Sequence, residues 1–199
     1  QLFCKTGEMA ASSPSKTHMG HYIASFEHDN IAMVHLILTN ISFQYEFPLN
    51  RWLNSLHCML LKKDQPYITK LRIIQLIEAD FNTSMKILLN RRIMRHANNA
   101  GVNSAHTHGD RQGRNTYDAM IISQLTTDIA RLNMSNLLVT FNDVDDCYDR
   151  MRPELCSEVL RRDGCPKTVA SCHSKAIVHM KYKILTAHGE SIIEIINTI

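Results

Sequence analysis

Four aspartates stand close together in one short stretch of the chain: Asp143, Asp145, Asp146 and Asp149. They follow an apolar run, Leu137 to Phe141, that predicts a buried strand. Carboxylates this close repel one another unless a cation lies among them. Mg²⁺ prefers oxygen ligands and often binds one or two carboxylates together with substrate phosphates. The pattern therefore indicates a site for Mg²⁺ or Mn²⁺ that performs phosphoryl or nucleotidyl transfer, with a further carboxylate supplied from elsewhere in the fold.

A polar turn is the alternative interpretation of these aspartates. Asp is common in turns, and here the turn would cap the helix that is expected to begin near Pro153. Local chemistry alone leaves both interpretations open.

The charge of the chain is divided unevenly along its length. The total is only +3, but the stretch from Lys86 to Arg114 holds six basic residues and one acid, and the stretch from Val139 to Glu158 holds six acids and two basic residues. A basic stretch of this kind suits a nucleic-acid backbone, and two solvated faces are the alternative.

The composition is that of a folded domain, because 44% of the 199 residues are apolar and 21% are charged. This excludes a disordered or collagen-like chain. The apolar runs are too short to cross a bilayer, so no membrane partner is expected. The cysteines lack CxxC spacing and no signal-like leader precedes them, so we expect an intracellular protein, cytoplasmic or nuclear and not secreted.

The elements that position these residues are expected to be mainly helical. Residues 1–20 are expected to be a flexible segment. A helix capped by Asp29 or Asn30 should reach about Tyr45. Trp52 to Leu61 fits helix or strand, and Leu71 to Leu76 fits a strand. The apolar stripe of the first helix is Ile31, Val34, Ile37, Leu38 and Ile41.

Four further helices are predicted downstream. The clearest runs from Glu78 to Ala100 and ends at Gly101. The second covers Tyr117 to Leu132, the third begins at Pro153 and ends at Gly164, and the fourth covers Pro166 to about Leu185. The apolar stripe of the second is Met120, Ile121, Leu125, Ile129 and Leu132.

The aspartate segment resembles motif A of reverse transcriptases of the non-LTR retrotransposon type. In that motif an Asp follows an apolar strand, an aromatic residue comes five positions later, and a second Asp comes six positions later, usually before Arg. The sequence Asp143-Val-Asp-Asp-Cys-Tyr148-Asp149-Arg150 has all of these features.

Four upstream segments resemble the same family in the same order. They are Ser13 to Tyr22, Lys62-Lys63 with Leu71 to Ile74, Ala79 to Asn82, and His108 to Ala119. The chain departs from the family pattern at a few positions. Thr107 stands in place of Gln, Asp110 in place of Ser, Ile73 in place of Pro and Asp146 in place of a small residue. The family's later motif, an aromatic-x-Asp-Asp turn, does not occur in the sequence.

The resemblance implies roles for the residues of the aspartate segment. Asp143 would ligate both metal ions, and Asp149 would support the site from the following turn. The metals would polarise the attacking 3′-hydroxyl and stabilise the leaving pyrophosphate. Tyr148 would lie against the incoming sugar and exclude a 2′-hydroxyl.

The resemblance also implies a set of basic contacts. Arg72 and Lys63 would reach the triphosphate of the incoming nucleotide, a task for which the planar fork of Arg is suited. Arg111 and Arg114 would hold the template backbone or the triphosphate, in contacts that tolerate any base sequence.

The fold implied is α/β, with a helix-rich fingers region and the start of a polymerase palm around a small, mostly antiparallel sheet. The fingers-like region would cover 21–136 and the first part of the palm 137–199. The expected partners are an RNA template, a DNA primer and deoxynucleoside triphosphates. We expect the chain to be a fragment that cannot polymerise alone, because it lacks the second catalytic strand. Two alternatives stay open: a non-catalytic nucleic-acid-binding remnant, and a helical interaction protein with an Asp-rich turn.

Overall fold

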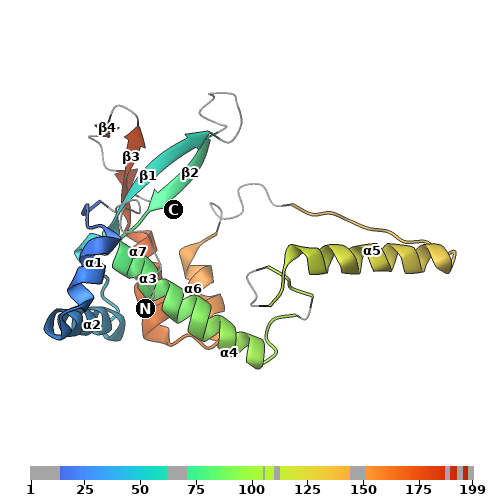
Figure 1. Ribbon diagram of the computed structural model, residues 1–199, viewed down its shortest axis with the longest axis horizontal. Helices are drawn as coiled ribbons and strands as arrows, with labels where there is room; N and C mark the ends of the chain where they lie inside the picture. Colours follow the sequence, from blue (N-terminus) through green and yellow to red (C-terminus); the bar gives the residue numbers. More distant parts are fainter. Residues whose placement is uncertain are drawn as a thin grey trace.

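The computed structural model describes residues 14–61, 71–104, 106–109, 113–143, 151–186, 189–191 and 195–196. Helices dominate, and one small sheet lies beside them (Figure 1). The predicted α/β class is confirmed. The helices are α1 (Met19–Phe26), α2 (Asp29–Gln44), η2 (Asn50–Leu53), α3 (Ala79–Met85), η4 (Lys86–Ile93), α4 (Met94–Asn99), α5 (Thr116–Leu132), α6 (Pro153–Arg162) and α7 (Lys167–Val178). The strands are β1 (Asn54–Leu61), β2 (Leu71–Leu76), β3 (Lys181–Thr186), β4 (Gly189–Glu190) and β5 (Ile195–Ile196).

The sheet has the order β2-β1-β3-β4, and β5 also pairs with β3. β1 and β2 form an antiparallel hairpin in which Leu60 lies opposite Arg72. β1 and β3 are parallel, with Asn54 opposite Lys181, and β3 is antiparallel to β4 and β5. The sheet is therefore mostly antiparallel, as predicted. The parallel pair joins β1, which lies in the predicted fingers-like region (21–136), to β3, which lies in the predicted first part of the palm (137–199).

The predicted long helix forms as a continuous unit of α3, η4 and α4 (Figure 1). Phe81, Met85 and Ile93 are buried on its inner side, as the apolar spacing predicted. Its middle segment, η4, is wound as a π-helix. The helix stops at Gly101, whose φ of 69° suits a residue without a side chain.

The core forms where this long helix meets the start of the sheet and α7. The Trp52 ring lies between Phe81, with ring centroids 5.0 Å apart, and Phe43, at 5.7 Å. α7 contributes mainly small side chains, including the fully buried Ala170 and Ala176, which let its backbone come close to these rings.

The end of the chain differs from the prediction. The helix predicted from Pro166 to Leu185 ends at Val178, and residues Lys181 to Thr186 form β3. The segment gains a ladder of hydrogen bonds to β1, and this tertiary pairing overrides the helical pattern. The preceding helix behaves as predicted: Pro153 occupies its first position, and Gly164 (φ 95°) follows its end.

The loop after α2 is fastened to α7 by Glu46. The Ser171 hydroxyl donates to Glu46 Oε2 at 2.7 Å, and the Lys175 ammonium lies 3.3 Å from the same oxygen. The hydrogen bond from Ser171, followed by the contact with Lys175, lowers the pKa of Glu46.

Two helices form as predicted, but their apolar faces are not buried as expected. α2 and α5 form close to the predicted bounds, but their apolar stripes are exposed rather than buried. In α2 the buried residues are Ser42 and Phe43, and in α5 none is buried. α5 extends away from the sheet and the other helices (Figure 1). The periodicity predicted the helices correctly, but in the described part of the chain these faces are left largely exposed.

The predicted strand from Leu137 to Phe141 is wrong. This segment is neither helix nor strand, and Leu138 and Phe141 are 88% and 91% exposed. An apolar run becomes a strand only when a neighbouring strand accepts its backbone hydrogen bonds, and no described strand pairs with it. Within the described ranges, no helix combines the length and the apolar character needed to cross a membrane.

Candidate functional site

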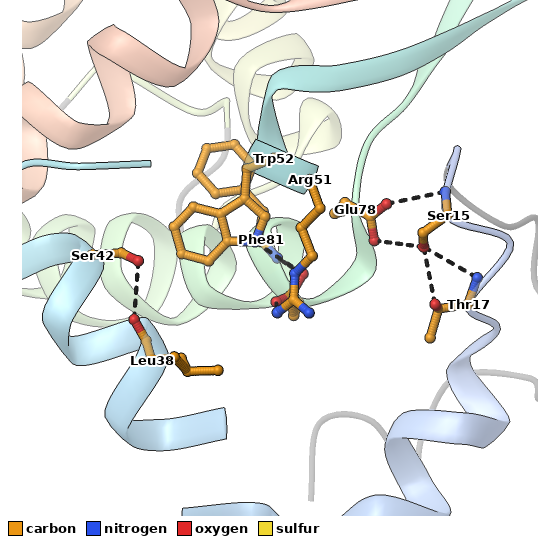
Figure 2. A network of polar contacts seen from close by, with 9 residues as sticks. Ser15, Thr17, Leu38, Ser42, Arg51, Trp52, Glu78 and Phe81 are labelled. Carbon is orange, nitrogen blue, oxygen red and sulfur yellow. Dashed lines mark hydrogen bonds and ion pairs between the residues drawn. The ribbon is translucent and has the colours of Figure 1, made fainter. Parts of the chain in front are cut away.

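A buried network of polar groups lies where β1 and α3 begin (Figure 2). Its centre is Asp80, which is only 7% exposed. The Trp52 indole Nε1 donates to Asp80 Oδ1 at 3.1 Å, and the Phe81 backbone N–H donates to the same oxygen at 2.9 Å. The Arg51 guanidinium pairs with Asp80 Oδ2. Asp80 therefore lies buried with both oxygens hydrogen-bonded, as a buried charge must.

Tyr22 from α1 joins this network. Its side chain is 3% exposed and is hydrogen-bonded to Asp80. Burial of the hydroxyl, followed by the negative charge of Asp80, raises the pKa of Tyr22 well above its ordinary value. Tyr22 stays protonated at neutral pH and fixes α1 to the start of α3.

Glu78 holds the segment before α1 in the same way. It is 1% exposed, and it accepts hydrogen bonds from Ser15 N at 3.2 Å and from Ser15 Oγ at 3.0 Å (Figure 2). Ser15 Oγ also lies 3.0 Å from Thr17 Oγ1. Residues 15–22 are thus tied to the start of α3 at two points, Glu78 and Asp80.

A polar pocket of about 270 Å³ opens beside this network. β3 supplies Lys181 and Lys183 to its wall, and Glu190 of β4 adds a carboxylate. Arg51, Ser15 and Glu78 also belong to the lining, together with Asn54 and Ser55 of β1. The pocket has charges of both signs, so it suits a polar ligand better than a simple anion or cation.

The structure describes three of the seven predicted site residues. Arg72 is exposed on β2, Arg114 is exposed just before α5, and Asp143 is exposed at the end of the segment that follows α5. No hydrogen bond or ion pair joins any two of these three described residues. Lys63, Arg111, Tyr148 and Asp149 lie outside the described residues.

The aspartate segment is described only up to Asp143. Within the described ranges, no three His, Cys, Asp or Glu side chains are grouped as metal ligands. The predicted metal ligand Asp143 is the last described residue of this segment, and it is exposed to solvent.

Two adjacent residues with ligand chemistry, Cys172 and His173, lie at the core: Cys172 is part of it, and the half-buried His173 packs against it. Cys172 is fully buried, and burial raises the pKa of its thiol to about 11. The His173 ring stacks on Phe81 with centroids 6.3 Å apart, and burial lowers the pKa of the imidazole. Both side chains are neutral at pH 7 and serve the packing of α7.

Sequence reasoning missed the buried polar network and the pocket beside it. The network contains three charged residues that stand beside large apolar residues in the sequence: Arg51, Glu78 and Asp80. Charged residues are mostly exposed, so a sequence predicts that one is buried only when its partner in the fold is known. The pocket depends on β3, which the sequence pattern assigned to a helix.

No protein-family model and no curated protein matches this chain.

Proposed function

We propose that the chain is part of an RNA-directed DNA polymerase of a retroelement, which transfers deoxynucleotides to a primer 3′-hydroxyl by two-metal catalysis. The observation that carries the proposal is the segment from Asp143 to Arg150, preceded by four further segments in the family's order. Each segment is weak evidence alone, but the order of all five is specific.

A contact in the fold supports the grouping of two of these segments. Tyr22 ends the first segment and Asp80 lies in the third, and the two side chains are hydrogen-bonded although 58 residues separate them. Segments that are packed together by buried polar contacts are expected to be retained together in one domain.

In this proposal Asp143 holds Mg²⁺ or Mn²⁺, and Asp149 supports the site from the following turn. The ions would supply Lewis-acid activation of the 3′-hydroxyl. Arg72, which lies on β2, and Lys63 hold the triphosphate, and Tyr148 contacts the sugar. Arg111 and Arg114 hold the template backbone or the triphosphate.

Nucleotide binding tests the proposal. A deoxynucleoside triphosphate with Mg²⁺ should bind the purified chain, and Arg72→Gln should weaken binding about tenfold by removing a charge-assisted contact to phosphate. Arg95→Gln, an exposed arginine on α4, is the matched control and should change little. Equal effects of the two substitutions would refute the assigned triphosphate contact.

Primer extension tests the predicted inactivity of the chain alone. The sequence has no aromatic-x-Asp-Asp turn to complete a two-metal site. We therefore expect no extension of a primer on an RNA template with Mg²⁺. Extension that disappears in Asp143→Asn would show instead that these 199 residues contain a complete catalytic site.

The exposed apolar helices favour a second candidate, a helical interaction protein. α5 has no buried residue, and α2 exposes most of its apolar stripe. In that case the aspartates form an ordinary turn, and neither metal nor nucleotide binds in a way that depends on Asp143 and Asp149.

A further inference from the structure

A second hollow, of about 280 Å³, lies between α1, α2 and the long helix formed by α3 and η4. It is separate from the polar pocket beside β3. Most of its wall is apolar, in contrast to the mixed charges of that pocket. The apolar wall residues are Phe26, Leu36, Phe43, Ile87 and Leu88.

Aromatic rings form one side of this hollow. The His35 ring lies between Tyr22, with centroids 5.8 Å apart, and Phe26, at 5.9 Å. These rings are tilted by 58° and 45° to one another rather than stacked flat. Tilted and offset rings are the usual favourable arrangement, and a further flat ring can join such a cluster in the same way.

Arg92 is the basic residue in the wall of the hollow. Its side chain is exposed, and it makes no hydrogen bond or ion pair with any other residue that the structure describes. A guanidinium group binds a carboxylate through two parallel hydrogen bonds. Arg92 therefore offers an anion-binding group at the edge of an apolar wall.

Arg92 lies on this wall with Leu88, four residues before it, and the π-helical winding of η4 also turns Ile87 toward the same side. Ile87 and Arg92 are five residues apart and line the same hollow. In an α-helix with 3.6 residues per turn they would point about 140° apart. In a π-helix the i→i+5 hydrogen bonds widen the turn, so residues five apart lie closer to one face than they do in an α-helix. The wide turn thus brings an apolar and a cationic side chain to one surface.

Asp80, at the start of the long helix, also lines the hollow. Asp80 and Arg92 are twelve residues apart on this helix, which corresponds to about three helical turns. Asp80 is also already paired with Arg51 and hydrogen-bonded to Trp52. An anionic ligand group therefore belongs at the Arg92 end, where it avoids the buried carboxylate.

We propose that this hollow binds a small aromatic carboxylate, with its ring among Phe26, His35 and Leu88 and its carboxylate on Arg92. Ligand sites commonly pair an apolar wall with a few polar groups, and a volume near the lower end of their range, about 300 Å³, suits one or two fused rings. The site is independent of the polymerase proposal.

Equilibrium dialysis with 2-naphthoate tests this site, with neutral 2-naphthamide as the matched probe. The chain should bind 2-naphthoate at one saturable site, about tenfold more tightly than the amide, because only the acid pairs with Arg92. Arg92→Gln should reduce the affinity for the acid to that for the amide. Arg91→Gln, the adjacent exposed arginine outside the hollow, should keep the preference.

A blocking variant separates the hollow from other apolar surfaces. Thr39→Trp fills the hollow from the α2 side and should abolish binding of both probes. The proposal is overturned if neither probe binds saturably, if the preference for the acid survives Arg92→Gln or is lost equally in Arg91→Gln, or if Thr39→Trp binds as the unmodified chain does.

Discussion

Trp52 and Asp80 are joined by a buried hydrogen bond of 3.1 Å from the indole Nε1 to Oδ1 (Figure 2). Trp52 has no exposed surface, and it is the single tryptophan of the chain. Its fluorescence therefore reports directly on the network that fastens α1, β1 and α3 together.

Asp80→Asn should lower the free energy of unfolding by about 2 kcal/mol, because it leaves the Arg51 guanidinium without its counter-charge. The loss is smaller than for a fully buried pair, since the Arg51 side chain is 35% exposed. Urea unfolding followed by Trp52 emission measures it. Asp128→Asn breaks the exposed pair with Arg131 and should cost less than about 0.5 kcal/mol. Equal losses in the two variants would contradict the role assigned to Asp80.

The Ser15 contact predicts how firmly the segment before α1 is held. Ser15→Ala removes the hydroxyl that donates to the buried Glu78, so tryptic cleavage after Lys16 should become at least about threefold faster. Ser25→Ala is the matched control, because the Ser25 hydroxyl donates only to the nearby His21 carbonyl. Unchanged cleavage in Ser15→Ala would contradict the fastening.

His173 predicts a pH dependence of stability. Burial lowers the pKa of its imidazole in the folded state, so the unfolded chain binds the proton more readily. The contribution of His173 to the free energy of unfolding is fully present above the unfolded-state pKa of about 6.5. It is lost as the pH falls from there through the lower pKa of the folded state. The free energy of unfolding at pH 5.5 and 7.5 should differ less in His173→Phe than in the unmodified chain. His28→Gln, at an exposed position, should keep the full difference.

Element positions could be predicted from the sequence more reliably than their environments. The long helix ending at Gly101, the helix after Pro153 and the strand Leu71–Leu76 form as predicted, because periodicity, a helix stop and a helix start are local signals. The segment at Leu137 was predicted as a strand from apolarity alone, and apolarity does not supply a pairing partner.

The candidate sites were less accessible to sequence reasoning, because they depend on contacts between distant residues. β3 pairs with β1 across more than a hundred residues and brings Lys181 and Lys183 to the polar pocket. Likewise, the apolar hollow beside Arg92 forms only where α1 and α2 meet the long helix.

The exposed face of α5 predicts an unequal response to two apolar substitutions. Leu125→Gln should change the free energy of unfolding by less than about 0.5 kcal/mol, since Leu125 is 55% exposed. Met85→Ala should cost about 3 kcal/mol, because Met85 is buried in the core. Urea unfolding of both variants measures the contrast. A large loss in Leu125→Gln would mean that α5 packs against another part of the molecule.

Metal binding tests the polymerase proposal most directly. Electron paramagnetic resonance of Mn²⁺ titrated into the purified chain measures it, with Mg²⁺ as competitor. We expect saturable binding that Mg²⁺ displaces, and we expect Asp143→Asn and Asp149→Asn each to weaken it at least about tenfold, because each removes a charged oxygen from the site. Asp128→Asn, on the exposed face of α5, should leave the binding unchanged. Binding that is absent, or that is the same in the Asp143→Asn/Asp149→Asn double variant as in the unmodified chain, would contradict a nucleotidyl-transfer site at this segment.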